Sequence, residues 1–103
     1  MKTKVLEKYN AVIVELKGNV MGGDDTKEFN ELLHKLIDEG KKNVIVDLAE
    51  VKFMNSSGLG MLISGLTTVK RENGSLKLAN VTEKIESLLI ITKLITIFET
   101  YES

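Results

Sequence analysis

The stretch from residue 43 to residue 60 constrains the fold of this chain most, because an apolar run there leads directly into a helical pattern. The consecutive β-branched residues at 44–46 are typical of a central strand that helices cover on both faces. From about residue 56 to residue 72, apolar residues recur at helical spacing, and Asn73-Gly74 supplies a stop signal. This combination predicts an α/β protein. The residues of the helix that we expect to face the core are Leu59, Leu62, Ile63, Leu66 and Val69.

The beginning of the chain predicts a β-hairpin. Two β-rich runs at 4–7 and 11–17 are separated by Lys8-Tyr9-Asn10. Ile13 points to the opposite side from the main apolar face of the second run, which suggests that both sides of this strand are covered. The residues of that main face are Val12, Val14 and Leu16.

Further strands and helices alternate along the rest of the chain. A helical pattern at 26–39 ends at Gly40, which is suited to a left-handed stop. The other predicted elements are a loop at 48–54, a strand containing Leu76 and Leu78, a helix at 82–91 and a closing strand around 95–98. The resulting order, β-β-α-β-α-β-α-(β), predicts a mixed sheet of four to five strands with helices packed mainly on one face.

Length and composition indicate a single domain spanning residues 1–103. The formal net charge of −1 gives no electrostatic reason to expect binding to nucleic acid or to a membrane surface. No stretch is long and apolar enough to cross a bilayer. Because the chain has no cysteine and no secretory signal pattern, we expect a cytoplasmic protein, and we expect it to be a monomer.

Two adjacent serines at the start of the central helix are the main candidate site. Asn55 is suited to cap the helix, and the hydroxyls of Ser56 and Ser57 fall where the helix dipole favours an added or bound phosphate. The simpler interpretation is that all three residues only start the helix. Gly58 and Gly60 favour a functional interpretation, since each costs about 1 kcal/mol relative to alanine and implies a close approach to the backbone.

Other chemistries lack their sequence requirements. His34, the only histidine, lies off the apolar stripe of its helix and has no partners at metal-ligand spacing, so we expect a surface residue and no metal site. There is no phosphate-binding loop of the Gly-x-x-x-x-Gly-Lys-Ser/Thr type. The serines lack the nucleophile-elbow pattern of a hydrolase. We therefore expect neither a catalytic residue nor a cofactor.

Residues 46–62, Val-Asp-Leu-Ala-Glu-Val-Lys-Phe-Met-Asn-Ser-Ser-Gly-Leu-Gly-Met-Leu, resemble the signature of STAS domains. The resemblance is to the small, stand-alone anti-sigma factor antagonists of bacteria. It extends over nearly the whole chain, including the strand at 74–78 and the segment at 89–94. It implies the STAS fold and a regulator of transcription that acts by switching partners.

The resemblance also implies a phosphorylation switch at Ser56. In that family, an anti-sigma factor that is also a serine kinase phosphorylates the first serine after the acidic residue, and a PP2C-type phosphatase reverses the reaction. The unphosphorylated protein captures the kinase and so frees the sigma factor. The partner-binding residues implied for this chain are Met21, Gly22, Gly23, Asp24, Asn55, Ser56, Ser57, Gly58, Leu59 and Met61.

Two positions depart from the family pattern. Asn55 and Met21 replace acidic residues that normally lie near the serine. Asp24 and Asp25 either provide substitute charges or cap the helix that follows. The departures leave two alternatives open. One is a non-phosphorylated STAS module in another partner-switching or transporter-associated complex. The other is a small-ligand binder that uses the Ser56 turn and the Gly22-Gly23 loop.

Overall fold

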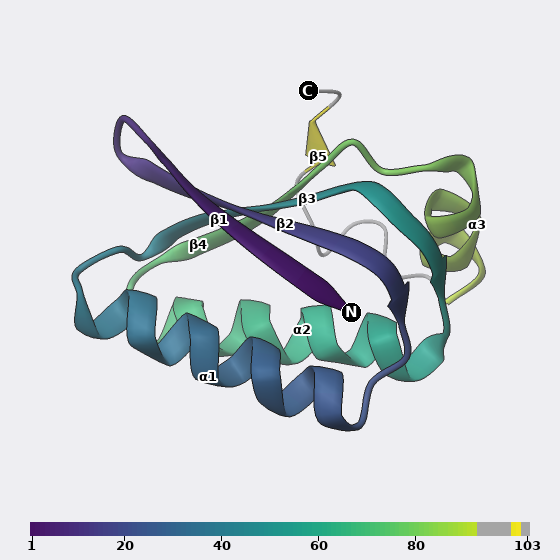
Figure 1. Ribbon diagram of the computed structural model, residues 1–103, viewed down its shortest axis with the longest axis horizontal. Coiled ribbons are helices and arrows are strands. Elements are labelled where there is room, and N and C mark those ends of the chain that lie inside the picture. Colours follow the sequence, from purple (N-terminus) through teal and green to yellow (C-terminus); the bar gives the residue numbers. More distant parts are fainter. Residues whose placement is uncertain (93–99, 102–103) are drawn as a thin grey trace.

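A mixed β-sheet with the strand order β1-β2-β3-β4-β5 forms one layer of the molecule, the two long helices form the other, and the last helix lies beside one end of the sheet (Figure 1). The computed structural model describes residues 1–92 and 100–101. The strands are β1 (Lys2–Lys8), β2 (Ala11–Val20), β3 (Asn43–Met54), β4 (Ser75–Ala79) and β5 (Thr100–Tyr101). The helices are α1 (Asp24–Asp38), α2 (Ser56–Arg71) and α3 (Glu83–Ile91). This architecture confirms the predicted α/β fold class and element order; the closing strand predicted around 95–98 lies outside the described residues.

The predicted hairpin is confirmed, and the rest of the sheet is parallel. β1 pairs antiparallel with β2 around a turn in which Tyr9 has a φ of 55°. β2, β3, β4 and β5 then pair in parallel. β3 lies at the centre of the sheet, as the apolar run at 44–46 predicted.

The two longest helices, α1 and α2, lie side by side on the same face of the sheet (Figure 1). The connections β2-α1-β3 and β3-α2-β4 step across the sheet in the same direction. Right-handed crossovers therefore place both helices on one face. The core lies between these helices and the sheet. Its largest fully buried side chains include Leu16, Phe29, Leu33, Leu48, Leu62 and Leu78.

Within the described residues, two expectations are not met: that both sides of β2 are covered, and that helices cover both faces of β3. Along β3 the buried side chains alternate, so that Val44 and Val46 are buried while Ile45 is only half-buried. On the second face, Ile13 is also half-buried, and Leu6, its partner across the hairpin, remains 39% exposed. A run of β-branched residues does not distinguish a strand that is covered on both faces from a strand that is covered on one face, because such residues favour both kinds of strand.

The turn-rich residues at 18–25 also predict a loop. That prediction is wrong for residues 18–20, and the predicted loop at 48–54 is wrong throughout, because both segments are strand. β2 continues to Val20 and β3 to Met54, and these two residues are paired. The register shifts twice, between Glu15 and Lys17 and again between Gly18 and Asn19. Gly18, with a φ of +86°, lies beside the second shift, where β3 carries one extra residue.

The helix boundaries agree closely with the sequence patterns. α1 begins two residues earlier than predicted, and Gly40, with a φ of +79°, follows its end. α2 and α3 match the predicted positions, and Thr82 caps α3 by accepting a hydrogen bond from the N–H of Ile85. No helix among the described residues is long and apolar enough to cross a membrane.

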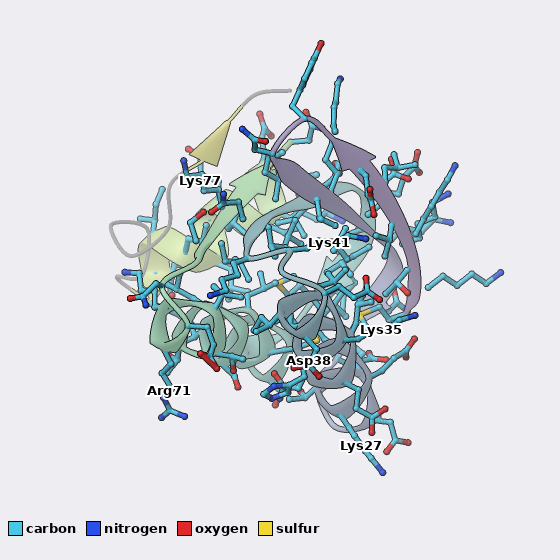
Figure 2. The ribbon with its side chains drawn as sticks, turned by 90° about the vertical axis from the view of Figure 1, so that its left-hand side faces the viewer. Lys27, Lys35, Asp38, Lys41, Arg71 and Lys77 are labelled. Carbon is cyan, nitrogen blue, oxygen red and sulfur yellow. The ribbon has the colours of Figure 1, made fainter. Side chains whose placement is uncertain are left out.

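Charged groups tie the hairpin to the carboxyl end of α1. The Lys41 ammonium donates hydrogen bonds to Glu7 of β1 and to Glu39, the latter at 3.2 Å. These bonds raise the pKa of Lys41 above its usual value. Figure 2 shows Lys41 beneath the hairpin and Arg71 projecting from the end of α2. Both lie at the end of the molecule opposite the start of α2.

Close packing of α1 on α2 depends on Gly65. A Cβ atom at this position would lie 2.6 Å from Cε2 of Phe29 and 2.9 Å from Cδ1 of Leu33. Both neighbours are fully buried and have little room to move.

We expect Gly65→Ala to lower the free energy of unfolding by about 1–2 kcal/mol, because overpacking outweighs the gain in helix propensity. Urea denaturation measures the change. Ser64→Ala, one residue earlier on the partly exposed face, is the matched control and should stay within about 0.5 kcal/mol of wild type. A Gly65→Ala protein more stable than wild type would contradict this account of the helix contact.

Candidate functional site

The candidate site lies where the carboxyl ends of β2 and β3 meet. Val20 and Met54 are the last paired residues of these strands, and the N–H of Asn55 donates to the carbonyl oxygen of Val20 at 3.4 Å. The loop at 21–23 and the start of α2 therefore leave the sheet side by side (Figure 1). The pairing brings together the two segments that the sequence predicted to form one surface.

Asn55 alone supplies the side-chain cap of α2. Its Oδ1 accepts a hydrogen bond from the N–H of Gly58 at 2.8 Å. Ser56 and Ser57 are both exposed, and within residues 1–92 neither hydroxyl has a hydrogen-bond partner. The interpretation that all three residues serve to start the helix therefore holds for Asn55 only. The two hydroxyls remain available at the positive end of the helix dipole.

Glycines allow the two segments to touch. A Cβ atom on Gly58 would collide with the carbonyl oxygen of Val20 and lie 3.1 Å from Cγ of Met54. A Cβ atom on Gly22 would lie 2.6 Å from Cβ of Ser57, and Gly22 also has a φ of +82°. Gly58 thus has the close backbone approach that its cost predicted. Gly60 does not, because no described atom lies within 4 Å of a Cβ atom built there.

Four of the predicted partner-binding residues are buried, so for them the prediction needs correction: Gly22, Gly58, Leu59 and Met61. Leu59 and Met61 are 2% and 1% exposed, and Gly58 is covered by Val20. Met54, the last residue of β3, is also buried. These side chains point into the core because they lie on the inner face of α2 or the helix-facing side of β3. They support the surface from below and do not form it.

The loop before α1 contributes an exposed edge beside the serines. Met21 is 45% exposed, and Gly23 and Asp24 are exposed too. The predicted capping by the acidic residues was wrong, since Gly23 occupies the N-cap position and no side chain caps α1. Asp25 lies in the first turn, where its Oδ2 accepts a hydrogen bond from the N–H of Met21 at 3.2 Å. It therefore holds the loop in place.

Asp47 has a structural role that the sequence did not reveal. Its Oδ1 accepts hydrogen bonds from the N–H of Ala49 and from Nδ2 of Asn80, both at 3.0 Å. Asn80 follows β4, so this carboxylate joins the middle of β3 to the end of β4. The only sequence signal for it was the Asp-Leu pair within the STAS-like motif.

An apolar groove lies between the end of β3 and α3. Phe53 is 50% exposed and Ile91 is 78% exposed. Ile85 and Leu88 form its floor, with Lys52 and Lys84 among the residues that line it. Among the described residues, no group of three or more His, Cys, Asp or Glu side chains is arranged to hold a metal ion, and His34 is exposed, as predicted. The arrangement is suited to contact with another protein.

Comparison with known proteins identifies the family. The STAS domain model matches residues 2–103. The chain belongs to the STAS domain family. A curated relative, the anti-sigma-B factor antagonist of Bacillus subtilis, is 33% identical over 82 residues, which are 78% of this chain and 75% of that protein.

Solved structures share the fold of this STAS domain at low sequence identity. The Bacillus cell fate determinant SpoIIAA in its phosphorylated form superimposes with a TM-score of 0.75 at 15% identity, covering 99% of this chain and 92% of that one. A sulfate transporter family protein from Wolinella succinogenes gives a TM-score of 0.78 at 16% identity, covering 93% and 80%. These two likenesses support the architecture alone.

We expect Asn55→Ala to lower the free energy of unfolding of this STAS domain by about 1 kcal/mol, because the N–H of Gly58 loses its side-chain partner. Asn55→Asp is the matched control. Its carboxylate keeps the acceptor and favours the helix dipole, so stability should equal or exceed that of wild type at neutral pH. Thermal denaturation of both variants distinguishes the cap from other effects, since equal losses would mean that the hydrogen bond does not stabilise α2.

Proposed function

We propose that this STAS domain is an anti-sigma factor antagonist that binds a kinase-type anti-sigma factor and is released when Ser56 is phosphorylated. The observation that carries the proposal is the state of the Ser56 hydroxyl. It is exposed, it has no described hydrogen-bond partner, and it lies at the start of a helix that Asn55 already caps. The family and the name of the Bacillus subtilis relative support the same role.

The physical basis of the switch is local charge. A phosphate on Ser56 adds a charge of about −1.5 to −2 at the centre of a surface whose exposed neighbours, Met21 and Ser57, are neutral. A partner surface shaped for a neutral hydroxyl would have to desolvate that charge, which weakens binding. The positive end of α2 stabilises the phosphoprotein itself by about 0.3–2 kcal/mol. The switch therefore needs no change of fold.

Replacement of the family's acidic residues by Asn55 and Met21 is compatible with this mechanism. Two fewer carboxylates beside Ser56 reduce the repulsion that a phosphate meets. Asp24, exposed in the first turn of α1, is a remaining acidic group that a kinase can recognise at this edge. We propose a PP2C-type phosphatase for the reverse reaction and a cytoplasmic monomer as the working form.

The same two substitutions favour one alternative. A kinase that recognises carboxylates at positions 21 and 55 would not engage this chain, and the domain would then be a non-phosphorylated module in another partner-switching or transporter-associated complex.

The decisive experiment incubates the purified chain with each anti-sigma factor kinase of the source genome and ATP, then maps the phosphate. We expect one kinase to bind the chain and to modify Ser56. Ser56→Ala should abolish labelling, whereas Ser57→Ala, which removes the neighbouring exposed hydroxyl, should retain it. Ser56→Asp should weaken binding at least about tenfold, which corresponds to about 1.4 kcal/mol.

A stable complex without phosphate on Ser56 would overturn the switch. If Ser56→Asp also bound that kinase as tightly as wild type, the non-phosphorylated module would be supported instead. Phosphate on Ser57 in place of Ser56 would show that the assignment is wrong by one residue.

A further inference from the structure

Gly60 is the one glycine of α2 that packing within the described residues does not explain. Gly58 lies against the carbonyl of Val20, and Gly65 lies against Phe29 and Leu33. Gly60 is exposed, and no described atom lies within 4 Å of a Cβ atom built on it. An exposed glycine inside a helix lowers stability by about 1 kcal/mol relative to alanine. The fold of this chain gains no packing contact in return.

The geometry of an α-helix relates Gly60 to Ser56. Residues four apart lie on the same helix face, about 5–6 Å apart at Cβ. Every Cα–Cβ bond also tilts towards the amino end of the helix, so a side chain covers the turn that precedes its own Cα atom. A side chain at position 60 would therefore extend over the turn that holds Ser56 and Ser57.

We infer that Gly60 is a specificity-determining position that keeps the Ser56 hydroxyl open to a modifying enzyme. Its missing side chain lets the backbone of that enzyme approach the first turn of α2. The identity of the enzyme as an anti-sigma factor kinase rests on the proposed function, whereas the steric role of Gly60 does not.

The charge pattern of α2 agrees with close approach by a protein. From Ser56 to Val69 the helix carries no charged side chain, and its only charges, Lys70 and Arg71, lie in the last turn at the opposite end (Figure 2). An enzyme that reaches Ser56 along this face therefore meets neutral groups and need not desolvate a charge.

A test that needs no partner uses Ser56→Cys, which introduces the only thiol of a chain that otherwise has no cysteine. The rate of modification by a bulky maleimide is compared in this background with and without Gly60→Leu. We expect Gly60→Leu to slow modification at least about fivefold, since the leucine covers the preceding turn. Thr67→Leu, on the same exposed face but two turns further along, is the matched control and should leave the rate unchanged.

A second test uses Gly60→Ala with the kinase that modifies wild-type Ser56. We expect phosphorylation to slow at least about tenfold, while the midpoint of thermal unfolding rises by about 4–8 °C because helix propensity improves. Thr67→Ala also improves propensity but adds no atom over Ser56, so its phosphorylation rate should equal that of wild type. A variant that is more stable yet poorly phosphorylated excludes misfolding as the cause.

The two tests separate the inference from the proposed function. Equal maleimide rates with and without Gly60→Leu would overturn the steric role of Gly60, whatever the kinase does. Slower maleimide modification together with no kinase that phosphorylates wild-type Ser56 would support the steric role and overturn the proposed switch. Unchanged phosphorylation of Gly60→Ala would overturn the inference and leave the switch intact.

Discussion

The parallel pairing of β2 with β3 is the constraint on which the candidate site depends. The two strands stay paired until Val20 and Met54, and the chain enters α2 against the carbonyl oxygen of Val20. Gly58 permits this contact because any side chain there would collide with that oxygen. If the strands separated earlier, the loop at 21–23 and the first turn of α2 would lie on different parts of the surface. Two register shifts, at each of which β3 carries one more residue than β2, keep the pairing intact over this distance.

The first turn of α2 divides its tasks among neighbouring residues. Asn55 satisfies a backbone N–H that the helix leaves unpaired, which is the usual task of a serine or asparagine at such a position. Ser56 and Ser57 are therefore free of that task and remain exposed. Below them, Leu59 and Met61 fix the helix to the core. Exposed hydroxyls above a rigidly packed inner face are a suitable arrangement for a switch. A charge added to a hydroxyl changes which partners the surface can bind, and the buried contacts of the helix stay undisturbed.

Much of the fold was predictable from the sequence, because periodicity reports which side of an element is buried. The hairpin, the three helices and the central position of β3 followed from patterns of apolar residues and from stop signals such as Gly40. The wrong loop predictions have a common origin in pairing between distant segments. Gly18, Asn19 and the stretch at 48–54 contain turn-like or polar residues, yet their backbone hydrogen bonds to each other hold them in strands. Coverage of the second sheet face was overestimated because Val and Ile suit both fully and partly buried strands.

For the candidate site, the sequence by itself determined which residues are candidates. The STAS-like motif, the cap at Asn55 and the cost of Gly58 and Gly60 all followed from residue type and spacing. Only the tertiary structure decided which of them reach the surface. It buried Leu59 and Met61 and explained Gly58 by an internal contact, while Gly60 faces outward. It also left Ser56 without a hydrogen-bond partner among the described residues. The physical reason is that Val20 and Gly22 decide which residues at the start of α2 are exposed. These residues lie more than thirty positions away in the chain, and no local pattern can report their approach.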